Sequence, residues 1–223
     1  MTDNRQNGTV PEETMGPVHK VVPLKVHYYG TPVVLISTLN PDGSTNIAPM
    51  SSAWWLDSDA MLGMSRSSRT TTNAARTGEL VLNLASADLV HHVDRLALLT
   101  GEEELSPHKL EKGYRYEPRK FEAAGLTPEP ADLVAADMVA ECPIQLECKV
   151  VDMHDFGNAR AIHAHILRSH VDTSLIVPGT DYVDPALWNP LLMKFCDFFG
   201  AAEPLTPSRL AAAWDIPGRL ERI

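Results

Sequence analysis

The feature that most constrains the fold is the stretch from Val33 to Asn83, where short apolar runs alternate with turn signals. It opens with a run rich in β-branched residues that ends at Leu39. Pro41-Asp42-Gly43 follows and indicates a hairpin, because Pro fixes φ and Gly supplies positive φ. Pro49 cannot donate to a ladder, so the next strand must lie at an edge or break there. We therefore predict strands over about 33–39, 45–55, 60–65 and 79–85.

Two segments of this stretch have the composition of a ligand site. Ala48 to Ser52 is small or irregular, which frees backbone groups to contact the polar edge of a ligand. Ser65 to Asn73 is rich in hydroxyl and Arg side chains, and a helix is predicted from about Thr70 to a C-cap at Gly78. Such side chains at a helix N-terminus bind phosphate. The alternative is a Ser/Thr-rich loop that only caps a surface helix.

The order of these pieces resembles the flavin reductase-like family: a strand, an Asp-Gly turn, a small-residue loop, a Ser/Thr/Arg segment and then Thr77–Asn83. The resemblance continues less tightly through Cys142–Cys148 and His163–Asp172, and it covers about residues 20–200. It implies a mainly β fold, an FMN-binding split β-barrel of Greek-key type with a few peripheral helices. It also implies a homodimer with FMN at or near the subunit interface.

The resemblance further implies an oxidoreductase in which NADH or NADPH passes a hydride to flavin N5. The electrons then leave to flavin, a monooxygenase or another acceptor. No catalytic acid or base is assigned, because this transfer depends on proximity and on stabilising the reduced flavin. The cofactor-binding residues that it implies are Ala48, Pro49, Met50, Ser51 and Ser52 at the ring, and Ser67, Ser68, Arg69, Thr70 and Thr71 at the phosphate, with Asn73 supporting that loop.

Two alternatives fit the same residues. One is a flavoredoxin-like electron-transfer or flavin-binding protein without nicotinamide activity. The other is an FMN-dependent oxygenase or redox enzyme that acts on a small organic substrate. Residues 101–130, with one short helix over Pro107–Lys112, would be a lid in the second case and an ordinary surface connection otherwise. Trp54 and Trp55 are expected to point to opposite sides of a strand, where one of them lines the isoalloxazine cavity or fills the barrel.

Composition and length limit the remaining possibilities. The 223 residues predict a disordered tail over 1–16 and one domain over 17–223 with a C-terminal extension from Gly179. A net charge of −10 argues against nucleic acid as a partner. The chain shows neither a signal peptide nor an apolar run of about 20 residues, which predicts a cytoplasmic protein without a membrane partner. Its three cysteines lack a C-x-x-C pair and are expected to be buried apolar residues rather than disulfides.

The histidines give no metal-binding motif. His163 and His165 alternate, so they should share one face of a strand. The sequence holds neither H-E-x-x-H nor a Cys/His cluster with zinc spacing, and we predict no metal site. Outside the first stretch we also predict a helix over Ser86–Leu96 and strands over about 144–153 and 160–171.

Overall fold

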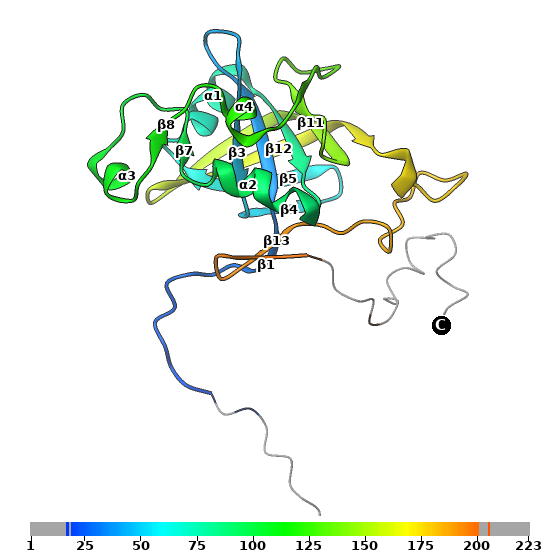
Figure 1. Cartoon of the computed structure of the whole chain (residues 1–223), viewed down its shortest axis with the longest axis horizontal. Coiled ribbons are helices and arrows are strands. Elements are labelled where there is room, and N and C mark those ends of the chain that lie inside the picture. Colours follow the sequence, from blue (N-terminus) through cyan, green and yellow to red (C-terminus); the bar gives the residue numbers. More distant parts are fainter. Residues whose placement is uncertain (1–16, 18, 201–204, 206–223) are drawn as a thin grey trace, which may run out of the picture.

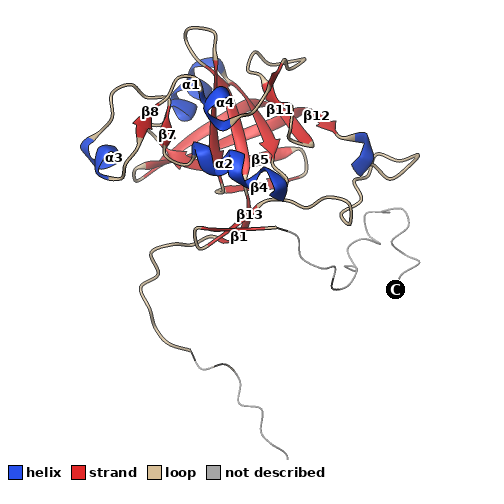
Figure 2. Ribbon diagram, in the orientation of Figure 1, coloured by secondary structure: helices blue, strands red, loops and turns tan. Residues whose placement is uncertain are grey.

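The computed structural model describes residue 17, residues 19–200 and residue 205, so the predicted disordered tail lies outside the described residues. The chain is mainly β, with a few short helices around one large sheet (Figures 1 and 2). That sheet has seven antiparallel strands in the order β3-β2-β6-β11-β12-β5-β4. Its strands are β2 (Val34–Leu39), β3 (Thr45–Met50), β4 (Ala53–Leu56), β5 (Asp59–Ser65), β6 (Glu79–Leu84), β11 (Ile144–Phe156) and β12 (Ala159–Val171).

The predicted mainly β architecture is confirmed, whereas the hydrogen-bonded ladder of the described strands stays open between β3 and β4. Pro49 lies in β3 at one end of this order, as its missing N–H requires. The single strand predicted over 45–55 is two strands in the structure. Ser51 and Ser52 belong to neither, and they form the connection between β3 and β4. The break turns β4 away to pair with β5 at the far end of the sheet.

The strand β2 is buried on both faces, which explains its nearly continuous apolar sequence. Val34 and Ile36 pack into one core with Leu62, Leu80, Leu82 and Ile162. Val33 and Leu35 face the opposite side and pack into a second core with helix residues such as Val93 and Phe121. The sheet is therefore covered on the side that carries the helices.

The predicted C-cap at Gly78 is confirmed. Helix α1 spans Arg69–Thr77; the Ser68 hydroxyl accepts the N–H of Thr71, and Gly78 ends the helix with φ 72°. The helix predicted over 86–96 is a 3₁₀ turn, η1 (Ala87–Leu89), followed by α2 (Val90–Leu96). The remaining helical segments are α3 (Pro107–Glu111), α4 (Lys120–Ala124) and the 3₁₀ turn η2 (Thr173–Leu175). None of the described helices is long and apolar enough to cross a lipid bilayer.

The remaining short strands pair with one another in three small sheets, separate from the large one. They are β1 (Tyr29–Pro32), β7 (Leu99–Thr100), β8 (Arg115–Tyr116), β9 (Pro128–Glu129), β10 (Met138–Val139), β13 (Leu192–Lys194) and β14 (Asp197–Phe199). The C-terminal extension pairs through β13 with the N-terminal strand β1, below the main sheet in Figure 1. In the long connection, β7 pairs with β8 in parallel, so both ends of the segment that carries α3 lie side by side.

The cysteines agree only in part with the prediction. Cys142 and Cys148 are buried, and burial raises the pKa of the Cys148 thiol to about 12, so this thiol is unreactive near neutral pH. Cys196 is exposed in the turn between β13 and β14, where its φ is 73°. The expectation that all three are buried is therefore wrong for Cys196, because that position forms a tight turn at the surface.

Candidate functional site

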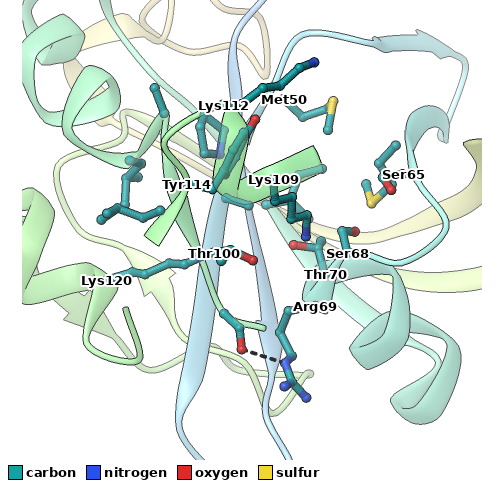
Figure 3. Close-up of a pocket in the computed structure, with 18 of the residues that line it drawn as sticks. Met50, Ser65, Ser68, Arg69, Thr70, Thr100, Lys109, Lys112, Tyr114 and Lys120 are labelled. Carbon is teal, nitrogen blue, oxygen red and sulfur yellow. Dashed lines mark hydrogen bonds between the residues drawn. The ribbon is translucent and has the colours of Figure 1, made fainter. Parts of the chain in front are cut away.

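A cavity of about 600 Å³, here called the main cavity, lies between the sheet and the helices (Figure 3). A volume of this size suits a small organic ligand. Its walls come from β2, β3, the end of β5, the N-terminus of α1, the end of α2 and the segment that carries α3. The apolar residues that line it are Ile36, Ala48, Pro49, Met50, Met64, Leu96, Ala97, Leu99, Phe156 and Ala159. The polar residues that line it are Ser65, Ser68, Arg69, Thr70, Thr100, His108, Lys109, Lys112, Tyr114, Lys120 and Asn158, together with Gly101.

The structure brings together six of the predicted cofactor residues and places the others around them. The six that line the main cavity are Ala48, Pro49, Met50, Ser68, Arg69 and Thr70. Ser67 lines an adjoining cavity of about 520 Å³. Ser51 and Ser52 line a different one, of about 350 Å³, beside Trp54 and Phe156. The segment predicted over 48–52 to contact the flavin ring is therefore divided between two cavities. The division falls where strand β3 ends and β4 has not yet begun.

Thr71 and Asn73 are fully buried behind the cavity wall, where they hold the N-terminus of α1 in place. The Thr71 hydroxyl donates to the carbonyl oxygen of Ser65. The Asn73 side chain donates to Asn40 Oδ1 at 2.8 Å and to Thr38 Oγ1 at 3.3 Å. These contacts fit the predicted support role of Asn73 and give Thr71 the same role.

Arg69 joins α1 to the long connection. Its Nε donates to the carbonyl oxygen of Gly101 at 3.0 Å, which is the dashed line in Figure 3, and its Nη2 lies 3.2 Å from a carboxylate oxygen of Glu102. Arg69 lines the main cavity, and its guanidinium group is engaged by this connection. Arg69 therefore fixes the start of the segment that carries α3.

We expect Gly101→Ala to destabilise this junction. A Cβ at this position would stand 2.7 Å from Asn46 Oδ1 and 2.9 Å from Arg69 Cγ, so the cavity wall must shift. Overpacking of this kind costs about 1–3 kcal/mol of unfolding free energy, and urea denaturation measures it. Glu103→Ala, at an exposed position of the same segment, is the control and should change stability little. Equal stability of Gly101→Ala and wild type would contradict the tight packing.

Lys120 is one of the cavity residues that the sequence analysis missed. Its side chain is 3% exposed, and its Nζ donates to Asn46 Oδ1 at 3.0 Å and to the carbonyl oxygen of Ile47 at 3.1 Å. Burial, with smaller effects from Lys109 and Arg69, lowers the pKa of Lys120 to about 8. The ammonium group therefore places a poorly hydrated positive charge in the cavity wall near neutral pH, where an anion can stabilise it.

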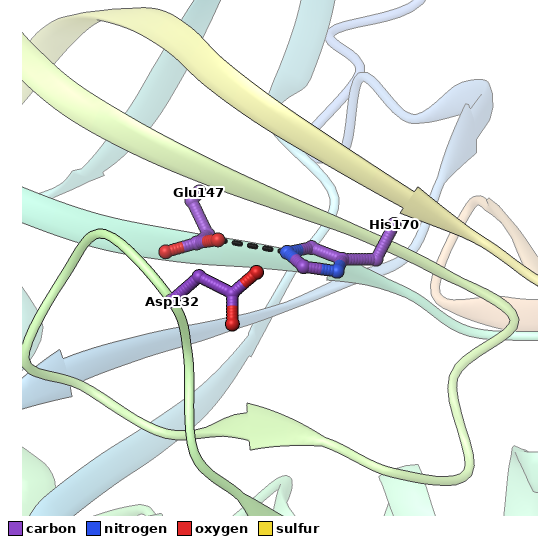
Figure 4. A group of neighbouring side chains, drawn as sticks. All are labelled: Asp132, Glu147 and His170. Carbon is purple, nitrogen blue, oxygen red and sulfur yellow. Dashed lines mark hydrogen bonds and ion pairs between the residues drawn. The ribbon is translucent and has the colours of Figure 1, made fainter.

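A second polar cluster lies on the long hairpin, away from the cavity (Figure 4). The Glu147 side chain is fully buried; its carboxylate pairs with His170 Nε2 at 2.7 Å and accepts the N–H groups of Leu133 and Val134. Potential ligand atoms of Asp132, Glu147 and His170 lie within 4.8 Å of one another, a set that the sequence analysis did not bring together. Arg168 bonds to Asp132 and would oppose a dication there. The arrangement instead anchors the loop before β10.

His163 and His165 share one face of β12, as predicted, and both contact the same oxygen of Asp59. Hydrogen bonding from His163, and less strongly from His165, lowers the pKa of Asp59. Trp54 is exposed and Trp55 packs against the core, so the expected opposite orientation is confirmed. Neither indole is among the residues that line the main cavity, and Trp55 packs against the core instead, as the second alternative expects.

The comparisons with known proteins fit this architecture. A family model described as "Flavin reductase like domain" matches residues 26–193, which is most of the chain. The chain belongs to the flavin reductase-like family. Its relative YdfE of Bacillus subtilis (strain 168), an uncharacterized protein, is 36% identical over 184 residues, covering 81% of this chain and 88% of YdfE. All the residues that line the main cavity lie within this matched range.

Solved structures place this flavin reductase-like chain in the same fold. The flavoredoxin of Desulfovibrio vulgaris (Miyazaki F) superposes with a TM-score of 0.72 at 22% identity, over 87% of this chain and all of that chain. Nitrilotriacetate monooxygenase component B from Bacillus cereus superposes with a TM-score of 0.68 at 17% identity, over 86% of this chain and 99% of that chain. A protein of Shewanella frigidimarina described as a "putative flavin reductase with split barrel domain" gives a TM-score of 0.63 at 18% identity, over 79% of this chain and 84% of that chain.

Proposed function

We propose that the chain is an FMN-binding oxidoreductase of the split-barrel type that takes electrons from NADH or NADPH and passes them to flavin, a monooxygenase or another acceptor. Family membership supports flavin chemistry in general, and the main cavity is the observation that supports the cofactor. Bound FMN would supply hydride acceptance and electron release there, while the chain supplies binding, orientation and electrostatics.

The residues of the main cavity fit a planar, phosphorylated group. Met50, Met64 and Leu99 supply apolar surface suited to an aromatic ring system. Ser68 and Thr70 stand at the N-terminus of α1, which is nine residues long, and N–H groups at such an end attract phosphate. Lys120 adds a buried positive charge to the same cavity. These side chains would hold the group and keep water from its apolar part.

The proposal needs no acid or base from the protein. Lys120 has an amine with a lowered pKa, and its role here is to stabilise negative charge rather than to transfer a proton. The Asn46 and Ile47 oxygens hold this amine against the cavity wall. Because an ordered cation needs no reorganisation when negative charge forms, such a group stabilises a reduced, anionic ligand more than an oxidised, neutral one.

Anaerobic titration of the FMN-loaded protein with NADH and with NADPH tests the function. Rapid bleaching of the flavin band by either nucleotide supports the proposal and identifies the donor. Flavin that stays oxidised while it remains tightly bound would overturn the nicotinamide step. The function would then be that of an electron carrier, as the name of the superposed flavoredoxin suggests, or of an enzyme that acts on a dedicated substrate.

We also propose that the protein is a homodimer, with the second copy seated over the exposed end of the sheet that carries β4. Trp54 is 57% exposed and Phe156 53% exposed, and both border the same small apolar cavity. Leu56, also on β4, is 67% exposed. Clustered exposed apolar side chains on a sheet edge are a typical protein interface.

Trp54→Glu is therefore expected to yield monomers, because a buried interfacial carboxylate without a partner strongly opposes association. Size-exclusion chromatography with light scattering measures the mass. Leu110→Glu, an equally exposed apolar position on α3, is the matched control and should leave the dimer intact. A monomeric wild type, or a dimeric Trp54→Glu protein, would contradict the proposed interface.

A further inference from the structure

Two imidazoles and a carboxylate meet on the large sheet, on the face opposite the first core. This group of Asp59, His163 and His165 is here called the Asp59 cluster. Asp59 begins β5 and lies directly opposite His165 of β12, and His163 stands two residues earlier on the same face of β12. His163 Nε2 lies 2.9 Å from Asp59 Oδ1, and His165 Nδ1 lies 3.3 Å from the same oxygen. Three groups able to ligate a metal ion therefore converge from two neighbouring strands.

The third member of the cluster explains why the sequence gave no metal-binding motif. Asp59 and His163 are 104 residues apart in the chain, so no local spacing pattern can contain both. Only the antiparallel pairing of β5 with β12 brings the carboxylate beside the two histidines. The prediction of no metal site considered local motifs, which a set of ligands assembled by strand pairing does not need.

The carboxylate of Asp59 is not occupied by a permanent cation. Within the part of the chain that the structure describes, neither an arginine nor a lysine bonds to it, and its charged contacts are the two histidines. The cluster in Figure 4 differs in this respect, because Arg168 bonds to Asp132 there. A dication at Asp59 would therefore not have to displace a guanidinium group or lie beside one.

The neighbouring strand β11 adds charges of both signs. Asp152 lies opposite His163, and Lys149 lies opposite His165. Since the two charges are opposite, their effects on an ion at the Asp59 cluster largely offset one another. The charge of Asp59 itself therefore dominates the local attraction for a cation.

The ligand chemistry of the Asp59 cluster favours a transition metal. Imidazole nitrogen with carboxylate oxygen suits Zn²⁺ and its neighbours in the first transition row, whereas Mg²⁺ and Ca²⁺ prefer oxygen ligands alone. Each ligand atom stands about 2.0–2.2 Å from a zinc ion, so two of them on one tetrahedral ion lie roughly 3.3 Å apart. The oxygen-to-nitrogen distances of 2.9 and 3.3 Å are close to that separation.

The side chains of the cluster are accessible to an ion from solvent. Those of Asp59, His163 and His165 are 42%, 35% and 49% exposed. An ion can therefore reach them directly, and rotation about the side-chain bonds can bring both imidazole nitrogens onto it. Three protein ligands leave the fourth tetrahedral position to water or to a small anion.

We propose that Asp59, His163 and His165 bind a divalent transition metal ion of the Zn²⁺ class, with one coordination position open to solvent. None of the three residues lines the main cavity, so this proposal is independent of the flavin site proposed above. The ion would join β5 to β12 and stabilise the folded chain, because the unfolded chain does not hold these ligands together.

Calorimetric titration of the full chain without a histidine tag tests the proposal, with Zn²⁺ as the probe and Mg²⁺ as the comparison. Wild type should bind one Zn²⁺ ion per chain and no Mg²⁺. His163→Ala and His165→Ala should each weaken Zn²⁺ at least about tenfold, a loss that even the hydrogen-bonding partners of metal ligands can cause. Asp59→Asn, which keeps the shape of the side chain and removes its charge, should also weaken binding.

Two control variants identify the place of binding. His91→Ala removes an exposed imidazole from α2 and should leave Zn²⁺ affinity unchanged. Asp132→Asn alters the cluster in Figure 4 and should also leave it unchanged. If Asp132→Asn weakens Zn²⁺ and the His163 and His165 variants do not, the ion lies in that other cluster and the proposal is wrong. Absence of Zn²⁺ binding by wild type would likewise overturn it.

Thermal unfolding gives a readout that does not depend on the titration. Zn²⁺ should raise the unfolding temperature of wild type and of His91→Ala, but not that of His163→Ala or His165→Ala. Cooperative unfolding of the metal-free variants verifies that they are folded. An equal rise in all four proteins would show that the ion stabilises the chain elsewhere, which contradicts the proposal.

Discussion

Lys120→Met is expected to weaken FMN binding by roughly 10- to 100-fold, since a hydrogen bond to a charged group contributes about 1.5–3 kcal/mol. The same variant should also unfold more easily, because the buried oxygens of Asn46 and Ile47 lose their donor, at a cost of about 1–3 kcal/mol for an unpaired group. Fluorescence titration with FMN and urea denaturation measure the two effects. The pH profile of FMN binding separates a binding role from a structural one.

The pH dependence of binding gives a second measurement on Lys120. Its pKa of about 8 means that the amine is charged below that pH and neutral above it. A phosphate monoester is already doubly charged above about pH 7. Wild-type affinity for FMN should therefore fall as pH rises through about 8, and this fall should be absent in Lys120→Met. Unchanged affinity and an unchanged profile in the variant would contradict the role of Lys120.

Lys120 also sets a pH dependence of stability. The unfolded chain holds the lysine proton up to a pKa of 10.5, whereas the folded chain releases it at about 8. Between these two values the unfolded state binds more protons, so the unfolding free energy should rise with pH. Lys112→Met, which removes the same charge from an exposed wall of the main cavity, is the matched control. Its effects should be smaller because solvent screens the exposed charge.

Glu147→Ala is expected to be the most destabilising single substitution considered, at about 3–5 kcal/mol of unfolding free energy. It removes the acceptor of two backbone N–H groups and the partner of His170 from a fully buried position. Glu147→Gln retains one acceptor oxygen and should cost about half as much. Urea denaturation gives the energies, and hydrogen exchange should show lost protection at Leu133 and Val134.

Glu141→Ala is the matched control for Glu147. Glu141 also accepts a backbone N–H, that of Thr127, but its carboxylate is exposed. Exposed interactions of this kind contribute about 1 kcal/mol or less. If the two alanine variants lose equal stability, burial is not what makes the Glu147 anchor strong. Retained exchange protection at Leu133 in Glu147→Ala would exclude the anchoring of the loop by this side chain.

Low pH should weaken the contacts of Glu147, because protonation removes the charge of its carboxylate. Burial alone would raise the pKa of the Glu147 carboxyl, but hydrogen bonds from His170, Leu133 and Val134 outweigh it and hold the pKa below its ordinary 4.5. A folded-state pKa below the unfolded value stabilises the protein above about pH 4.5. This contribution is lost as pH falls through the lower folded value. Wild type should therefore lose more stability in that range than Glu147→Gln, which has no carboxyl to titrate.

Local sequence signals predicted the parts of the fold that depend on backbone chemistry. Pro49 indicates an edge or a break because it lacks an N–H, and Gly78 ends α1 as a C-cap. The same signals could not show that Ser51 and Ser52 form a break rather than part of a strand. Small hydroxyl residues are compatible with both, and the pairing of β4 with β5 decides between them.

The candidate site was predicted less completely because side-chain direction depends on tertiary contacts. Arg69 lies in the predicted phosphate segment, yet its guanidinium contacts Gly101 and Glu102 from a distant part of the chain. Lys120 follows Arg119 in a charged stretch and looks like an exposed residue. One sequence signal could have indicated that Lys120 is buried. Phe121 and Ala124 form the apolar side of a short helix, and Lys120 lies next to that side.

The parallel pairing of β7 with β8 has a consequence for how this protein can diversify. Leu99 and Thr100 lie beside Arg115 and Tyr116, so the intervening segment leaves and re-enters the body at nearly one place. A loop whose ends are already fixed together can change length at little entropic cost. The segment with α3 is thus a replaceable module: exchanging it would alter which molecules enter the main cavity and the adjoining cavity that contains Ser67, while the sheet beneath keeps its register.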